Sequence, residues 1–166
     1  MARFRKGETI AEYYNEVYGV TIKPVRIEKI ENVLEGKNLE QALRFKENFC
    51  TPKNCHSNSC GSILWDYEGY DLSFCEGIAG AIDHCWTCFT NKETGEKRYI
   101  DFTINKEYDA YIFNEWNKDD IMQLFNTCKY AFIPHSEMYE YINKNKTTRR
   151  LYKKYYPNAQ RVKCLV

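Results

Sequence analysis

The sequence has no long apolar run. No window approaches the roughly eighteen consecutive apolar residues that a membrane-spanning helix needs. The first residues, Met1 to Lys6, are not followed by the apolar stretch of a secretory signal peptide. We therefore expect a cytoplasmic protein that does not bind membranes.

Several common catalytic motifs are also absent. The sequence contains no Walker loop, no dinucleotide-binding glycine fingerprint after a strand, no His-Glu-x-x-His and no Gly-x-Ser-x-Gly. These absences argue against the usual nucleotide-dependent, zinc-protease and serine-hydrolase chemistries. We expect a site that uses no cofactor.

Length and composition favour one globular domain over residues 1–166. It would comprise a helical part at 1–49, a core at 50–116 that carries the chemistry, and a helical, basic part at 117–166. The net charge of +1 indicates no particular partner, and the oligomeric state is not readable. In a reducing compartment, the eight cysteines are free thiols, metal ligands or a nucleophile rather than disulfides.

The residue pattern predicts an α+β fold with a central antiparallel sheet of about four strands. Helices are expected at 10–18 after the cap Thr9, at 25–34, from Asn38 onward, at 55–64 after Asn54, at 118–130 and at 136–143. Aromatic and β-branched stretches predict strands at 67–74, 82–90, 97–104 and 108–116. A helix that carries a cysteine would pack beside this sheet.

Cys55, His84 and Asp101 occur in an order that suits nucleophilic catalysis. A free thiol is mostly protonated at neutral pH, so an imidazole must accept its proton, and a carboxylate must orient the imidazole. Cys55 lies in the first turn of its predicted helix, where unsatisfied amides favour a thiolate. These residues predict a catalytic triad.

The hairpin between the two relevant strands tests this prediction. If Lys92 to Gly95 form a four-residue loop closed by Asn91 and Glu96, Asp101 lies opposite Trp86. Asp101 is then diagonal to His84 on the same face of the sheet. A three-residue loop would turn Asp101 to the other face.

Four short motifs in this region resemble the papain-like and transglutaminase-like superfamily. The resemblance is closest to small bacterial and phage proteins that read Cys-aromatic-x-Asn-Ala, Tyr-x-Glu-Gly-Tyr, His-Ala-Trp and Asp-x-Thr. The corresponding stretches here are Cys55 to Ser59, Tyr67 to Tyr70, His84 to Trp86 and Asp101 to Thr103. His56 replaces the aromatic residue, and Ser59 and Cys85 replace alanines.

The resemblance implies a papain-like or transglutaminase-like fold and a cysteine-dependent acyl-transfer enzyme: a protease, an amidase or a transglutaminase-like enzyme. The substrate would be a peptide, a protein side-chain amide or a small amide. The protein would act in the cytoplasm, or in the host cytoplasm if a phage encodes it. Residues with a further role in binding substrate or the oxyanion are expected among Asn54, Asn58, Glu68 and Trp86.

Other interpretations remain open. Cys55 could be a small buried hydrophobe, His84 a core histidine, and Asp101 a turn cap or a partner of Lys97. The same fold could serve as a non-catalytic binding protein, such as a phage accessory or anti-defence factor.

Two further alternatives concern other parts of the sequence. A structural zinc site would draw on Cys50, Cys55, Cys60, His84, Cys85 and Cys88, although their spacing is irregular for one. The basic stretch 144–163 has eight Lys or Arg, no acidic residue and three tyrosines. It could bind nucleic acid, but a solvated face or docking to an acidic part of the protein is the favoured interpretation.

Overall fold

The computed structural model describes residues 9–80, 82–128 and 145–158. The chain divides into two compact units. One comprises residues 23–122 and contains Cys55, His84 and Asp101, and the other is formed by residues 1–22 together with 123–166. The prediction of a single domain stays a prediction.

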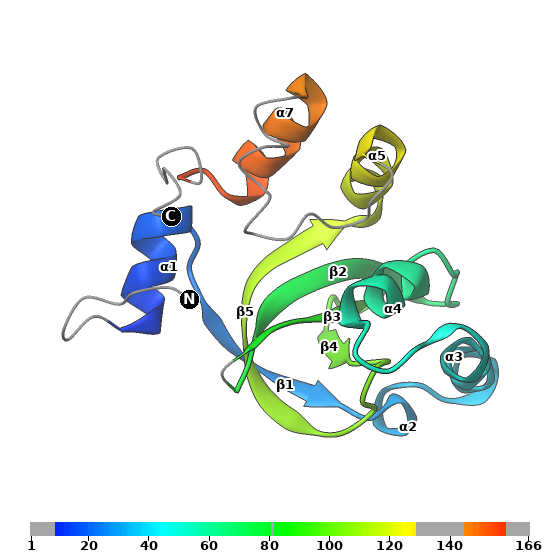
Figure 1. Ribbon diagram of the computed structural model, residues 1–166. Coiled ribbons are helices and arrows are strands. Elements are labelled where there is room, and N and C mark those ends of the chain that lie inside the picture. The colour runs from blue at the N-terminus through cyan, green and yellow to red at the C-terminus, as the bar shows by residue number, and fades with distance from the viewer. Residues whose placement is uncertain (1–8, 81, 129–144, 159–166) are drawn as a thin grey trace. The chain divides into compact units, whose positions relative to one another are not determined.

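A closed five-stranded barrel forms the larger unit (Figure 1). Its strands are β1 (Lys23–Glu28), β2 (Tyr70–Ala79), β3 (Ile82–Asn91), β4 (Lys97–Ile100) and β5 (Tyr108–Asn117). They follow the order β1-β4-β3-β2-β5 around the barrel. All neighbours are antiparallel except β1 and β4, which pair in parallel over two residues.

The predicted papain-like or transglutaminase-like α+β fold, with a central antiparallel sheet of about four strands, is therefore wrong. The missing strand lies in residues 25–34, which were expected to form one helix. They instead form most of β1 and the short helix α2 (Ile30–Val33). β1 pairs with β5 on one side and β4 on the other, and this long-range pairing closes the barrel and overrides the local helical pattern.

Alternation along β3 separates two hydrophobic cores. Trp86 and Cys88 face the barrel interior, where they pack with residues of three other strands: Ile27, Cys75, Ala110 and Ile112. Phe89 faces outward into a second core, which also includes Ile30, Leu34, Ala42, Phe45, Tyr67, Ile100 and Phe102. One strand thus contributes to both layers of the unit.

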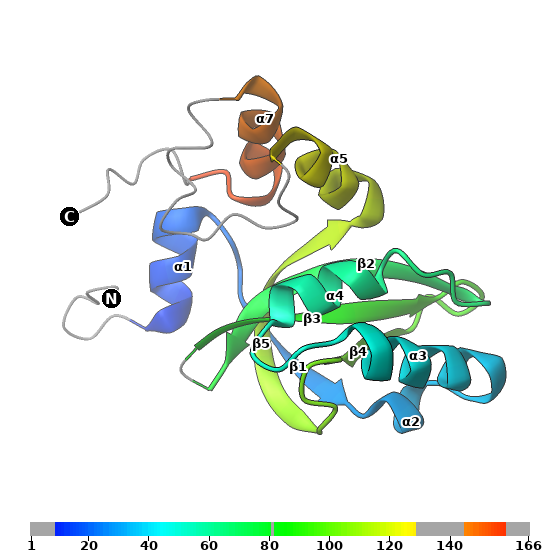
Figure 2. The same ribbon diagram turned by 45° about the vertical axis from the view of Figure 1, so that its right-hand side comes forward.

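Three helices cover the outer core. α2 is followed by α3 (Gly36–Phe49) and α4 (Cys55–Ser62), and both views place α4 across β2 and β3 (Figure 2). The Ser62 and Thr87 hydroxyls share a buried 2.5 Å hydrogen bond that joins α4 to β3. The predicted helix at 55–64 is confirmed to within two residues, and it is attached to the strand that carries His84.

The smaller unit contains α1 (Ile10–Tyr18) and α7 (Lys146–Tyr155). The predicted helix at 10–18 is confirmed, with Thr9 and Glu12 forming a capping box and Gly19 ending the helix at φ 70°. α7 exposes a basic face, but Tyr152, Tyr155 and Tyr156 are buried, which removes the aromatic rings expected to stack on bases.

Strand β5 continues directly into helix α5 (Lys118–Cys128). This helix confirms the predicted helix at 118–130 to within two residues, whereas the one predicted at 136–143 lies outside the described residues. No helix within the described ranges is both long and apolar enough to cross a lipid bilayer.

Replacing Gly77 by alanine should destabilise the barrel. Gly77 lies opposite His84, and an added Cβ would come within 2.2 Å of both the Trp86 ring and the Tyr111 carbonyl oxygen. Because neither the buried indole nor the backbone can move freely, we expect Gly77→Ala to lower the free energy of unfolding by about 2 to 3 kcal/mol in urea denaturation.

Gly95→Ala is the matched control, because Gly95 has φ 72° with open space around it. It should cost about 1 kcal/mol through backbone strain alone. Equal losses in the two variants would contradict the close packing around Gly77.

Candidate active site

Cys55 is the first residue of α4, after the N-cap residue Asn54. The first amides of a helix have no carbonyl partner within it, so this position favours a negative charge. The Cys55 side chain is largely buried, with 9% of the residue exposed. Its sulfur therefore combines a polar local environment with restricted access to water.

His84 and Asp101 are in direct contact. The Nε2 atom of His84 lies 2.8 Å from Oδ2 of Asp101, and both side chains are buried. The strand register explains this contact, since the hairpin is closed by a 2.9 Å bond from the Asn91 amide to the Glu96 carbonyl. The four-residue loop is confirmed, and the pairing from Thr90 with Lys97 to Thr87 with Ile100 brings Asp101 to the predicted place.

The carboxylate of Asp101 is completely buried and accepts four hydrogen bonds. Oδ2 accepts one from the Tyr108 hydroxyl at 2.7 Å, besides the contact with His84. Oδ1 accepts bonds from the amides of Thr103 at 2.7 Å and Ile104 at 3.3 Å. A buried charge needs such compensation, and these bonds also hold the carboxylate in one orientation toward His84.

Asn58 connects this carboxylate to the helix that carries Cys55. Its amide nitrogen donates to the Thr51 carbonyl at 2.8 Å and to the Thr103 hydroxyl at 2.9 Å, and its oxygen accepts from the Thr51 amide. Both Asn58 donors are therefore already used within the protein. The side chain positions the loop of Asp101 against α4, whereas the sequence made it a candidate for binding an oxyanion.

The charges at the site support one another. Interaction with the Cys85 thiol, followed by interactions with His56 and His84, lowers the pKa of Cys55 despite its burial. Burial opposes protonation of His84, but its bonds to Asp101 and Cys55 prevail and raise its pKa to about 9. For Asp101, hydrogen bonds from His84 and Tyr108 outweigh burial and lower the pKa. The site therefore favours a thiolate beside an imidazolium.

No family model, curated protein or solved structure matches this chain. The resemblance to papain-like and transglutaminase-like proteins thus stays a prediction. The argument for a site is the 2.8 Å contact between His84 and Asp101, together with the effect of Cys55 on the pKa of the same imidazole.

The remaining predicted residues make contacts other than those expected of a substrate or oxyanion site. The side-chain nitrogen Nδ2 of Asn54 donates to the Thr51 hydroxyl at 3.2 Å, and the side chain makes no capping hydrogen bond to α4. Trp86 is fully buried in the barrel interior, where its Nε1 has no hydrogen-bond partner among the described residues. It packs near His84, with 6.3 Å between ring centroids, so it shields the histidine from water.

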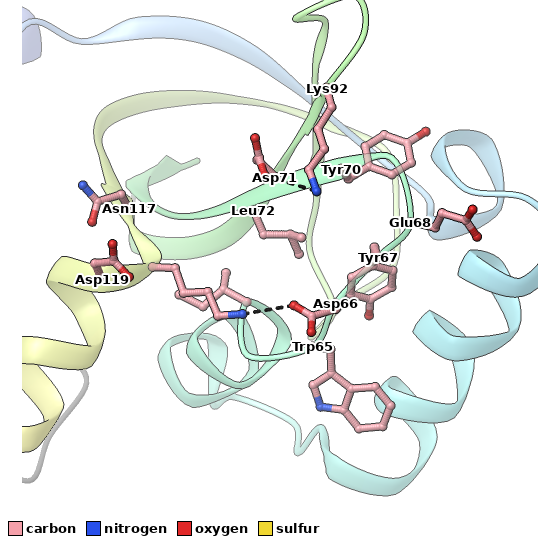
Figure 3. Close-up of a pocket in the computed structure, with 12 residues that line it drawn as sticks. Trp65, Asp66, Tyr67, Glu68, Tyr70, Asp71, Leu72, Lys92, Asn117 and Asp119 are labelled. Atoms are coloured by element: carbon pink, nitrogen blue, oxygen red, sulfur yellow. Dashed lines mark hydrogen bonds and ion pairs between the residues drawn. The ribbon is translucent and has the colours of Figure 1, made fainter.

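Glu68 lines a separate cleft of about 670 Å³ at the other end of α4 (Figure 3). Cys55 does not line this cleft, and the helix between them is roughly 12 Å long. Figure 3 shows its two ion pairs, between Lys118 and Asp66 at 3.3 Å and between Lys92 and Asp71 at 3.6 Å. Glu68 is therefore placed apart from the thiol.

Two residues near Cys55, His84 and Asp101 received no role from the sequence. Tyr108 reaches Asp101 because the chain returns from β4 to β5, a connection that no local pattern predicts. His56 has its Nδ1 atom 3.7 Å from the Cys55 sulfur. The sequence shows that His56 directly follows Cys55. The position of its ring beside the sulfur, however, is set by the backbone of the first turn of α4.

Donor atoms of Cys55, His56 and Cys85 lie within 4.8 Å of one another and could hold a metal ion. A closed structural zinc site takes four ligands, and this group of described residues supplies three. Cys88, part of the predicted zinc set, faces the barrel interior instead. The structure thus brings together a different donor set from the one that the spacing suggested.

Asp101→Asn should lower the pKa of His84, because the variant keeps the shape of the side chain and removes its negative charge. That pKa is now about 9, and the bond from Asp101 is the main contribution that raises it. We expect it to fall by about one pH unit or more in an NMR titration of the imidazole ring protons.

Asp71→Asn is the control, because Asp71 is exposed and paired with Lys92 in the separate cleft. The His84 titration should not change in this variant. An unaltered pKa in Asp101→Asn would show that the carboxylate does not control the imidazole.

Proposed function

We propose that the protein is a cysteine-dependent acyl-transfer enzyme that uses Cys55, His84 and Asp101. The observation that carries the proposal is the buried 2.8 Å contact between His84 and Asp101. The Cys55 sulfur also helps to raise the pKa of the same imidazole. Because Nε2 of His84 faces Asp101, Nδ1 is the nitrogen that exchanges a proton with the sulfur.

In the proposed first step, the Cys55 thiolate attacks the carbonyl carbon of an amide and a carbon–sulfur bond forms. The carbonyl electron pair moves to oxygen, and the backbone N–H of Cys55 at the start of α4 would stabilise the oxyanion. When the tetrahedral intermediate collapses, the carbon–nitrogen bond breaks and His84 gives its proton to the leaving amine. A thioester on Cys55 remains.

In the second step, an acceptor attacks the thioester carbonyl carbon while His84 takes the acceptor's proton. The carbon–sulfur bond then breaks, the acyl group leaves on the acceptor, and Cys55 is again a thiolate beside the protonated His84. Water as the acceptor gives a protease or an amidase, and an amine gives a transglutaminase-like transfer. The chemistry needs no cofactor. We propose a peptide, a protein side-chain amide or a small amide as substrate, and a reducing cytoplasmic compartment that keeps Cys55 as a thiol.

The contact between His84 and Asp101 favours catalysis over a purely binding role. A binding protein has no need to hold a buried carboxylate with four hydrogen bonds against a histidine. The cost of burying that charge is better explained if the imidazole must carry a positive charge in the reacting enzyme.

Iodoacetamide at pH 6 should alkylate Cys55 ahead of the other described thiols. Cys50 provides an internal control, because it is only half-buried but burial raises its pKa to about 11. We expect peptide mass mapping to find the label on Cys55 and not on Cys50. The rate should fall roughly tenfold or more in His84→Ala, and the label should disappear in Cys55→Ala. Labelling that is independent of both residues would refute an activated thiol.

Acyl transfer itself can be followed with p-nitrophenyl acetate. One acetyl group should be trapped on Cys55 in intact-mass measurements, and Asp101→Asn should slow its formation. The imidazolium is present below the His84 pKa of about 9, so turnover with amide substrates should decline as the pH rises through 9. In Asp101→Asn this upper limit should move to lower pH. Acetylation that persists in Cys55→Ala would exclude the proposed nucleophile.

A further inference from the structure

A second thiol lies beside the proposed nucleophile. The sulfur atoms of Cys55 and Cys85 are within 4.8 Å of each other. Cys85 is 1% exposed, whereas Cys55 is 9% exposed. An incoming reagent therefore meets Cys55 first, and Cys85 is reached only through the protein. The proposed acyl transfer gives Cys85 no step of its own.

The two sulfurs are carried by elements that are firmly joined. Cys55 begins α4 and Cys85 lies in β3, and the buried bond between Ser62 and Thr87 connects the same two elements. A disulfide has a sulfur–sulfur bond of about 2.05 Å. Side-chain rotation of two neighbouring cysteines is the smallest movement that could close the remaining distance.

A second pair of thiols provides a contrast within the same barrel. Cys75 and Cys88 interact in the interior, and neither has any exposed surface. A water-soluble oxidant has no direct access to that pair. Among the described residues, Cys55 and Cys85 form a pair that combines proximity with one accessible member.

We propose that Cys85 is a resolving thiol, which converts peroxide-oxidised Cys55 into a Cys55–Cys85 disulfide and so switches the site off reversibly. This inference rests on the proposed function, because the same Cys55 thiolate that attacks a carbonyl carbon reacts with the oxidant. The oxidant is a hydroperoxide, which is small enough to enter a site that is largely closed to solvent.

The chemistry balances in two steps. The Cys55 thiolate attacks one oxygen of hydrogen peroxide, the oxygen–oxygen bond breaks, and hydroxide leaves to become water while Cys55 becomes a sulfenic acid. The Cys85 sulfur then attacks the Cys55 sulfur, its proton leaves with the hydroxyl group as water, and a sulfur–sulfur bond forms. Two thiols lose two electrons, and one peroxide is reduced to two waters.

The product also protects the enzyme from irreversible damage. Without a neighbouring thiol, a sulfenic acid reacts with more peroxide to give a sulfinic acid, which ordinary thiols do not reduce. The Cys55–Cys85 disulfide stops this sequence and returns to two thiols when dithiothreitol is added. Cys85, which replaces the alanine of the family motif, thus has a chemical role beside the catalytic histidine.

The test is to treat the full chain with hydrogen peroxide and map the modified residues by mass spectrometry. No Lys or Arg lies between Lys53 and Lys92, so trypsin leaves both cysteines on one peptide. Cleavage after glutamate, at Glu68 and Glu76, separates them. We expect the intact protein to lose two hydrogen atoms and the two fragments to be linked through Cys55 and Cys85.

Two variants sharpen the result. In Cys85→Ala, Cys55 should gain two oxygen atoms, and dithiothreitol should no longer restore its alkylation by iodoacetamide. Cys88→Ala is the matched control on the same strand, and it should form the disulfide and recover as the wild type does. The proposal would be overturned if peroxide-treated wild type, before dithiothreitol is added, carried sulfinic acid on Cys55 and gave no linked fragments.

Mass mapping separates this proposal from the proposed function. If the fragments are linked but p-nitrophenyl acetate never acetylates Cys55, the resolving thiol is supported and the proposed acyl-transfer function is refuted. Acetylation on Cys55 without linked fragments would have the opposite meaning. If Cys85→Ala fails to fold, the identity of the linked residues in the wild type still decides the question.

Discussion

The complete burial of the Asp101 carboxylate is the constraint on which the candidate site depends. A charge removed from water must be compensated, and four donors do so here, from His84, Tyr108, Thr103 and Ile104. Each donor is also held in place by the carboxylate. The contact that stabilises the charge therefore sets the orientation of the imidazole and raises its pKa.

Closure of the barrel makes this arrangement possible. β4 ends just before Asp101, and β5 begins at Tyr108. Because β5 also pairs with β1 and β2, the tyrosine is fixed where its hydroxyl reaches the carboxylate. Asn58 adds a link through Thr103 to the helix that carries Cys55. The thiol and its partners thus come from separate segments that the barrel and its outer helices hold together.

The local part of the site was predictable from the sequence. The turn residues 92–95 set the length of the hairpin loop, and strand alternation then put Asp101 on the side of His84. The fold was not predictable in the same way. Residues 25–34 have apolar spacing that suits a helix, yet Val25 and Ile27 belong to a strand because two distant strands pair with it. The helical propensity of this segment is outweighed by strand pairing, which provides hydrogen-bond partners for the backbone along both edges of β1.

The remaining site residues show the same division. The neighbours of Cys85 in the sequence gave no sign that its sulfur would lie beside Cys55, since that contact depends on how α4 packs on β3. Glu68 lies close to the core motifs in sequence, but α4 separates it from the thiol. By itself, the sequence determined the helix that carries Cys55, the hairpin register and the His84 to Asp101 pairing, which depend on short-range turn and alternation rules. Only the tertiary structure decided the closed barrel, the bond from Tyr108 and the pair of thiols, because each requires contact between segments that are distant along the chain.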